Sequence, residues 1–264
     1  MGRVAAVVVA AGRGLRFAGG ENKAFAPLLD RPLLAHTLER LEAAGVGRYV
    51  VVVAPGEEAR CMAEVVRPFG FRPARVVAGG PRRSDSVRAG LRALEREGAC
   101  DAVLVHDGAR PLASPDLWRR VAQAALEAGA AVPVLPVTDA VKRVEGERVR
   151  ATLSRESLFL AQTPQGFLPD LLRRAHRLEG EPAGELPDAG DDAALVEALG
   201  WEVVAVPGEP WNLKVTYPAD RLLAEAWLRS LGREASAGGS AGAAPGEPGR
   251  FPGGALPRRG EGGC

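Results

Sequence analysis

The sequence predicts an α/β fold with a mostly parallel sheet, helices on both faces of that sheet and a protruding β-hairpin arm. The first observation is a set of short, uninterrupted apolar runs, such as 4–10 and 48–54, which are typical of strands buried on both faces. The second is the alternation of these runs with helix-like segments, which favours right-handed βαβ crossovers. The third is an apolar–polar alternation over 138–155, which indicates a hairpin. The expected arrangement is Rossmann-like, and its ligands should bind at the carboxyl ends of the strands.

Strand and helix signals alternate through the first two-thirds of the chain. Pro32 begins one helix and Gly45 ends it, while Ser114 followed by Pro115 is a strong N-cap signal for another. The expected strands are 4–10, 48–54, 74–78, 102–106 and 130–137, and the expected helices are 32–44, 57–69, 86–97 and 115–127.

The alternation changes at Thr138, where the predicted hairpin begins, with its turn at 145–147. A lone two-stranded hairpin is only marginally stable, so we expect the arm at 138–155 to pack on a second subunit and form a homodimer. The predicted domain covers residues 1–231 and ends with helices 169–178 and 192–199, strand 202–206 and helix 219–231. Residues 232–264 are rich in Gly, Ala and Pro, and we expect them to form a disordered tail.

The composition argues against several classes of protein. The formal net charge is +1, so the molecule as a whole does not attract nucleic acid or a membrane surface, and we expect neither as a partner. The three cysteines show neither a disulfide framework nor zinc spacing, which fits a reducing compartment. No run approaches the ~20 apolar residues of a membrane span. We therefore expect a cytoplasmic protein.

Lysine is scarce in this chain. Of the 34 basic residues, only Lys23, Lys142 and Lys214 are lysine, and the others are arginine. The remaining lysines are candidates for positions that need a compact ammonium rather than a planar guanidinium.

The loop after the first strand has the composition of a polyphosphate site. Small residues let backbone N–H groups approach phosphates without a clash at Cβ, and two cations follow on the same stretch. The loop lacks the third glycine of a dinucleotide fingerprint and the Gly-Lys-Ser/Thr ending of a P-loop. An ordinary tight turn is the alternative interpretation. The candidate residues are Ala10, Ala11, Gly12, Gly14, Arg16 and Lys23.

Two further loops follow predicted strands. In 79–86, glycines, two arginines and a helix N-terminus could form an anion or base pocket, with Gly80 and Ser86 as candidates, although a plain helix cap explains the pattern equally well. In 106–111, Asp107 is a natural Mg²⁺ ligand beside a phosphate loop, with Ala109 and Arg110 as candidate nucleotide-binding residues. A salt bridge between Arg110 and Asp107 is the structural alternative. We expect His106 to pack rather than react.

Two cations complete the set of candidates. Lys214 lies in WNLKVT, which we interpret as a short strand near the end of the domain, and Arg155 lies at the base of the hairpin.

The ordered motifs resemble one known family. VVVAAGRGLRF, a lysine seven residues past its arginine, GGPRRSDSV, HDGARP, PVTDAVKR, QTPQGF and NLKVTYPAD occur in this order over roughly 3–231. Together they are similar to the 2-C-methyl-D-erythritol 4-phosphate cytidylyltransferases of the non-mevalonate isoprenoid pathway. The resemblance implies cytidylyl transfer from CTP with Mg²⁺ as cofactor, in a homodimer whose arm extends over the neighbouring subunit.

The resemblance also implies roles for individual residues. Arg16 and Lys23 would stabilise the transition state on the CTP phosphates, and Asp107 would lie near the metal ion. Arg155 and Lys214 would position methylerythritol phosphate. The residues that would hold the nucleotide are Ala10, Ala11, Gly12, Gly14, Gly80 and Ser86.

Two alternatives stay open at this point. Ala140 and Gly190 stand where a threonine is usual in the family, and Pro81 replaces an acidic residue near the cytosine site. The two missing hydroxyls leave a ribitol-5-phosphate cytidylyltransferase as one alternative. A non-catalytic nucleotide-binding protein is the other, although a mere binder does not need transition-state cations.

The acceptor phosphate is already anionic at neutral pH, so no general base is expected.

Overall fold

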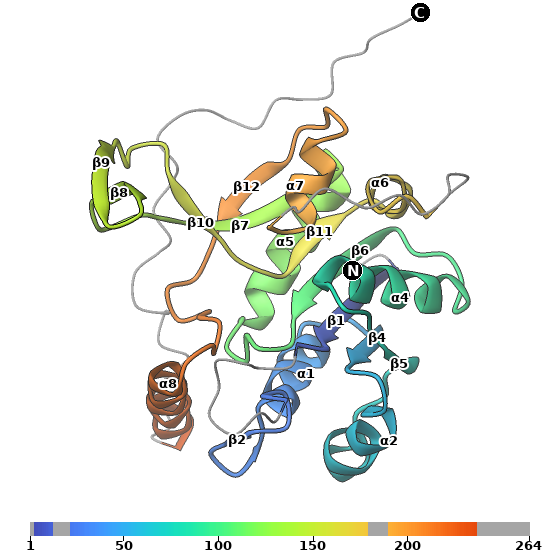
Figure 1. Cartoon of the computed structure of the whole chain (residues 1–264). Helices are drawn as coiled ribbons and strands as arrows, with labels where there is room; N and C mark the ends of the chain where they lie inside the picture. The colour runs from blue at the N-terminus through green and yellow to red at the C-terminus, as the bar shows by residue number, and fades with distance from the viewer. Residues whose placement is uncertain (1–2, 13–21, 179–189, 237–264) are drawn as a thin grey trace, which may run out of the picture.

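In a computed structural model, which describes residues 3–12, 22–178 and 190–236, the chain forms an α/β fold around one central sheet (Figure 1). The eight-stranded sheet has the order β10-β7-β11-β6-β1-β4-β5, with β12 paired to β7. Strands β1, β4, β5, β6, β7 and β12 run parallel, whereas β10 and β11 are antiparallel to their neighbours. The six parallel strands are β1 (Val4–Ala10), β4 (Arg48–Val53), β5 (Arg75–Ala78), β6 (Ala102–Asp107), β7 (Ala130–Pro136) and β12 (Val204–Pro207).

Helices cover both faces of this sheet, as the sequence predicts. Side chains of β1 alternate between two cores: Val8 faces one and Val7 faces the other. The first core is closed by α1 (Leu33–Ala43), α5 (Pro115–Ala128) and the helical segment 58–69. The second is closed by α4 (Arg83–Glu95), α6 (Pro169–Ala175) and α7 (Asp192–Glu197).

The helices follow the predicted signals, with shifted ends. Ser114 caps α5, since its Oγ accepts a hydrogen bond of 3.1 Å from the backbone N–H of Leu117. The helix α4 begins at Arg83, three residues before the predicted start, because the Asp85 carboxylate accepts from the backbone N–H of Arg82. The segment 58–69 is not one regular helix but α2 (Glu58–Cys61), the π-helical η1 (Met62–Val66) and α3 (Arg67–Phe69).

Short strands account for most of the differences from the sequence prediction. The strands β2 (Pro27–Leu28), β3 (Arg31–Pro32), β10 (Phe159–Ala161) and β11 (Gln165–Phe167) have two or three residues each and were not predicted. The strand predicted around Lys214 is wrong: this segment is a loop. Its apolar side chains pack instead against α8 (Pro218–Ser236) in a small third core. The helix α8 extends five residues beyond the predicted boundary at 231, and the rest of the predicted tail lies outside the described residues.

The predicted arm is a separate two-stranded antiparallel sheet, formed by β8 (Val141–Glu145) and β9 (Arg148–Leu153). Figure 1 shows it projecting from the end of β7, beyond the edge of the central sheet. Its apolar side chains are largely exposed, 52% for Val144 and 62% for Val149. Among the residues that the structure describes, no helix has the length and apolarity that a membrane span requires.

Candidate active site

The loop that follows β1 packs directly against the loop that follows β5. A Cβ on Gly79 would lie 2.6 Å from the Cβ of Ala11 and 2.5 Å from Ser86 Oγ, so only glycine permits this approach. Ser86 Oγ accepts a hydrogen bond of 3.1 Å from the backbone N–H of Gly80. The structure therefore brings the predicted nucleotide residues Ala11, Gly80 and Ser86 together at the carboxyl ends of the strands. Gly14 and Arg16, which were predicted to belong to the same loop, lie outside the described residues.

Lys23 is held beside the end of β1 by its neighbour Asn22. The buried Asn22 side chain donates to the backbone carbonyl of Ala10 at 2.9 Å, and its Oδ1 accepts from the backbone N–H of Ala24 at 3.0 Å. The Lys23 Nζ in turn donates to the carbonyl of Val215 at 2.9 Å. The chain thus places an ammonium group between the β1 loop and the segment that carries Lys214.

Asp107, at the end of β6, is the centre of a cluster of cations. Its Oδ2 lies 2.8 Å from Lys214 Nζ, and its Oδ1 accepts from Arg83 Nε at 3.0 Å. Arg110 Nε lies 3.9 Å from the same carboxylate, so the predicted structural alternative of a salt bridge to Arg110 is present as the longest of the three pairs. Burial would raise the pKa of Asp107, but Arg83 and Lys214 hold it well below its usual range. The carboxylate is therefore ionised at any physiological pH.

Arg83 connects this cluster to the second core. Its Nη1 donates to Asp192 Oδ2 at 2.7 Å, and Asp192 Oδ1 lies 2.9 Å from His176 Nε2. Burial would lower the pKa of Arg83, but Asp192 and Asp107 raise it above its usual value. The sequence motif 79–86 predicted that its two arginines contribute to an anion or base pocket, and it did not indicate the pairing of Arg83 with Asp107 and Asp192. The signal that could have identified Arg83 is its position at a helix start facing the end of a neighbouring strand.

The loop with Lys214 is fixed to the end of β6 by two residues that follow Asp107. The backbone N–H of Val215 donates to the carbonyl of Ala109 at 2.9 Å, and Arg110 Nη1 donates to the carbonyl of Asn212 at 2.7 Å. Ala109 and Arg110 were predicted to bind the nucleotide, and their contacts in this structure hold the lysine loop in place.

His106 packs, as expected from the sequence. It is fully buried, its ring centroid lies 4.5 Å from that of Trp118, and its two ring nitrogens face Thr163 Oγ1 and the Arg110 carbonyl. Burial lowers the pKa of His106 to about 3, so the side chain is neutral at any pH at which the protein works.

The buried neutral His106 makes stability depend on pH. Between the folded pKa of about 3 and the unfolded value of 6.5, the unfolded chain binds more protons, so stability falls as pH falls through 6.5. We expect the free energy of unfolding in urea to be about 2 kcal/mol lower at pH 5 than at pH 7.5. Burial also lowers the pKa of His36, which adds to the effect. A His106→Gln variant should lose most of this difference, and equal stability of the wild type at both pH values would contradict the assignment.

Comparisons with known proteins show which family this chain belongs to. The family model described as IspD, 2-C-methyl-D-erythritol 4-phosphate cytidylyltransferase, matches residues 4–230. The chain belongs to this family. This membership confirms the family, the fold class and the enzyme class, a nucleotidyltransferase, that the sequence predicted.

Individual relatives of the cytidylyltransferase family are similar over most of this chain. The enzyme from Geotalea uraniireducens is 42% identical over 234 residues, which cover 88% of this chain and 99% of the relative. A bifunctional IspD/IspF enzyme from an Anaeromyxobacter strain is 50% identical over 223 residues, and this chain spans 55% of its length. The crystal structure of the enzyme from Thermus thermophilus is 39% identical with a TM-score of 0.68, covering 85% of this chain and 98% of that one. None of these names favours the ribitol alternative.

Arg155, a residue predicted to position the acceptor, makes its hydrogen bond at the arm rather than in the Asp107 cluster of its own chain. It precedes β10, and its guanidinium donates to the carbonyl of Thr138, so these two residues close the base of the arm. Within one subunit, Lys23 bonds to the residue after Lys214 and Lys214 pairs with Asp107, whereas the Arg155 guanidinium bonds to the base of the arm.

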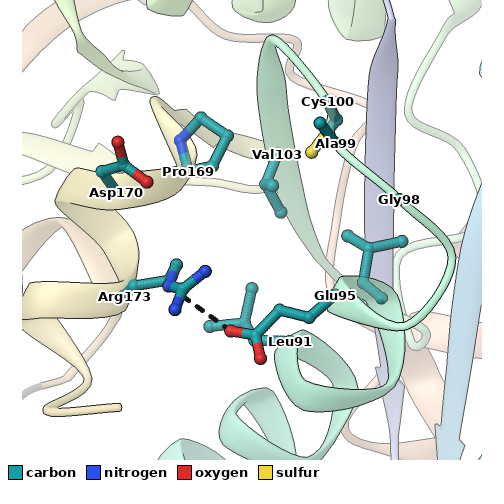
Figure 2. A pocket seen from close by; sticks show the side chains of 10 residues that line it. Leu91, Glu95, Gly98, Ala99, Cys100, Val103, Pro169, Asp170 and Arg173 are labelled. Atoms are coloured by element: carbon teal, nitrogen blue, oxygen red, sulfur yellow. Dashed lines mark ion pairs between the residues drawn. The ribbon is translucent and has the colours of Figure 1, made fainter. Parts of the chain in front are cut away.

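A separate cavity of about 470 Å³ lies at the opposite end of β6 and α4 (Figure 2). Leu91, Leu94 and Val103 line it, and an ion pair of 3.4 Å between Glu95 and Arg173 lies beside it. Val103 is near the start of β6 and Asp107 is at its end, so this cavity is distinct from the cationic cluster.

The described residues contain no group of three or more His, Cys, Asp or Glu side chains that could hold a metal ion alone. Asp107 is a single carboxylate, 11% exposed, that stays ionised beside the β1 loop. This fits Mg²⁺, which usually binds one or two carboxylates and takes its other ligands from substrate phosphates and water.

Proposed function

We propose that this chain transfers a cytidylyl group from CTP to 2-C-methyl-D-erythritol 4-phosphate, and that it releases 4-diphosphocytidyl-2-C-methyl-D-erythritol and pyrophosphate. The observation that carries the proposal is the cluster at the carboxyl ends of β1, β5 and β6. There, a glycine-lined loop, the cations Lys23, Arg83 and Lys214 and the ionised Asp107 meet in a chain of this family.

The nucleotide occupies the side of the cluster where the β1 and β5 loops meet. Backbone N–H groups of Ala11 and Gly12 approach its phosphates, because neither residue carries a side chain larger than a methyl group. Gly80 and Ser86 hold the base and ribose side. Lys23 directs its ammonium group toward the phosphates, where negative charge increases as the bond to the leaving group breaks.

The acceptor approaches from the side of the lysine loop. An oxygen of its phosphate monoester, which has a second pKa near ~6, attacks the α-phosphorus of CTP in line with the leaving pyrophosphate. One oxygen–phosphorus bond forms while the bond to the β-phosphate oxygen breaks, and no proton needs to be removed. Catalysis is therefore positioning and charge stabilisation, with Lys214 holding the acceptor phosphate.

Mg²⁺ is the divalent ion that fits this site best. Asp107 would hold it together with the phosphates of CTP, and the ion would neutralise charge on them and orient them. Lys214, which pairs with Asp107 in this structure, would then turn toward the acceptor phosphate.

The proposed active form is a cytoplasmic homodimer joined through the arm. Its support is the exposed apolar surface of β8 and β9 and of the adjoining Leu160, which is 60% exposed. A second subunit covering this surface would also place Arg155 beside the acceptor of the neighbouring chain.

One assay tests the reaction and the acceptor together. Pyrophosphate release should be rapid with CTP, Mg²⁺ and methylerythritol phosphate, and far slower with ATP, GTP or UTP. Ribitol 5-phosphate is the matched acceptor control, since it keeps the phosphate and changes the carbon skeleton. Equal turnover of UTP would contradict the cytidylyl assignment, and faster turnover of ribitol 5-phosphate would change the acceptor.

A further inference from the structure

Gln162 is a buried residue in the loop between β10 and β11, and its side-chain amide forms hydrogen bonds to a single other loop, at residues 209–212. Its side-chain nitrogen donates to the carbonyls of Glu209 at 2.8 Å and of Asn212 at 3.4 Å. Its side-chain oxygen accepts from the backbone N–H of Glu209 at 3.0 Å and from Asn212 Nδ2 at 3.3 Å. An amide has two N–H donors and two acceptor lone pairs, so its full hydrogen-bonding capacity is directed at residues 209–212.

The loop that Gln162 holds is the one that carries Lys214. Residues 208–215 contain no helix or strand, so no regular backbone ladder fixes their path. A Cβ on Gly208 would lie 2.6 Å from Gln162 Oε1, which shows how closely the loop wraps around this amide. Two residues after Asn212 the chain reaches Lys214, whose Nζ lies 2.8 Å from Asp107.

Gln162 itself is anchored independently of the lysine loop. Its backbone N–H donates to the carbonyl of Pro133 in β7 at 2.7 Å, and only 5% of the residue is exposed. The next residue, Thr163, accepts from the backbone N–H of Asp107 at 3.0 Å. The same short segment therefore fixes both the carboxylate and the loop of the lysine that faces it.

We propose that Gln162 is a positioning residue for the acceptor: it sets the location of Lys214 against the acceptor phosphate without touching substrate. The inference rests on the proposed function, because it assigns Gln162 to the acceptor half of that reaction. Hydrogen bonds of a buried side-chain amide are stronger than those exposed to water, so they can hold a loop in one position. A displacement of a catalytic cation by about 1 Å lowers rates by up to about 100-fold. Ala11 and Ser86, in the nucleotide half, form no hydrogen bond with Gln162 or with residues 209–212 in the described structure; Lys23 bonds to the lysine loop further along, at the carbonyl of Val215.

The test replaces Gln162 with methionine, which keeps the length of the side chain and removes all four hydrogen bonds. In the full-length enzyme we expect kcat/KM for methylerythritol phosphate to fall at least about tenfold. The Kd of CTP, measured by calorimetry without acceptor, should stay within about threefold of the wild-type value. A Tyr49→Phe variant is the stability control, since the buried Tyr49 side chain also loses a hydrogen bond, to the exposed Glu42, at the far end of the sheet. It should keep wild-type kcat/KM.

A double-mutant cycle separates positioning from general destabilisation. If Gln162 acts through Lys214, adding Gln162→Met to a Lys214→Ala enzyme should lower kcat/KM for methylerythritol phosphate by less than about a further twofold. An effect that multiplies fully with that of Lys214→Ala, or a loss of CTP affinity equal to the loss of acceptor turnover, would overturn the proposal. If the methionine variant does not fold, Gln162→Glu is the second variant, because it keeps the two hydrogen bonds that Oε1 accepts and places an oxygen, in place of the donating nitrogen, against the carbonyls of Glu209 and Asn212.

The outcome can be separated from a failure of the proposed function itself. If the wild type does not turn over CTP with methylerythritol phosphate, the proposed reaction is wrong. The positioning role is then read from amide hydrogen exchange of residues 212–215, which should be faster in Gln162→Met than in the wild type and unchanged in Tyr49→Phe. Unchanged exchange in Gln162→Met would overturn the positioning role whatever the reaction.

Discussion

Replacing Lys23 with alanine should lower kcat by two or more orders of magnitude while CTP still binds. The expected loss corresponds to one preorganised charge on the reacting phosphates, about 3–4 kcal/mol. Asn22 and the carbonyl of Val215 fix this ammonium group beside the β1 loop, so it needs no reorganisation as charge develops in the transition state. The measurement is single-turnover pyrophosphate release at saturating CTP.

Lys23→Arg should also be slow, although it keeps the charge. A planar guanidinium is larger than an ammonium group and cannot direct its charge to one point, and the chain retains lysine here while using arginine at almost every other basic position. Arg119→Ala is a control for the loss of a cation: this side chain pairs with Asp116 on α5 and should be dispensable for turnover. A Lys23→Arg enzyme with a near-normal rate would contradict the argument from lysine scarcity.

The sequence predicted long and continuously apolar elements well. The strand β1 has the bounds that were predicted, because an uninterrupted apolar run of this length, ended by glycine, favours a strand buried on both faces. β10 and β11 were missed because three residues carry no detectable periodicity, and their pairing to β6 and β7 is decided by tertiary hydrogen bonds. The strand assigned around Lys214 was wrong for a related reason. Its alternating apolar side chains satisfy a small core against α8 rather than a sheet.

The candidate site could also be predicted only in part from the sequence. Asp107 and the β1 loop could be predicted because parallel strands place their carboxyl ends, and the loops that follow them, at one edge of the sheet. The contact between Arg83 and Asp192 joins residues that are 109 positions apart, and no local pattern in either segment indicates it. The role of Gln162 is equally non-local, since its side chain hydrogen-bonds to Glu209, which is 47 positions away in the sequence.

The second large effect concerns the arm and Arg155. Thr138 and Arg155 close the base of the hairpin, while Val144 and Val149 beyond them are more than half exposed. Deleting residues 140–153 and joining the ends with a short glycine linker should leave the central sheet and both of its cores intact. We expect a folded monomer that binds CTP and has lost turnover, because Arg155 would no longer be held against the acceptor of a neighbouring subunit.

Complementation between two inactive variants tests whether Arg155 acts across the dimer. In a heterodimer of Lys23→Ala and Arg155→Ala subunits, one composite site would contain both Lys23 and the partner's arginine, and the other site neither. Random subunit exchange makes about half of the dimers heterodimers, so about a quarter of all sites should be intact. The mixture should therefore recover about a quarter of the wild-type activity. If Arg155 instead acts within its own chain, every site in the heterodimer lacks one of the two groups and no activity returns. Sedimentation of the wild type tests whether a dimer is needed at all. A fully active monomer would show that the arm stabilises a single subunit. The acceptor phosphate would then be held by Lys214 without help from a second chain.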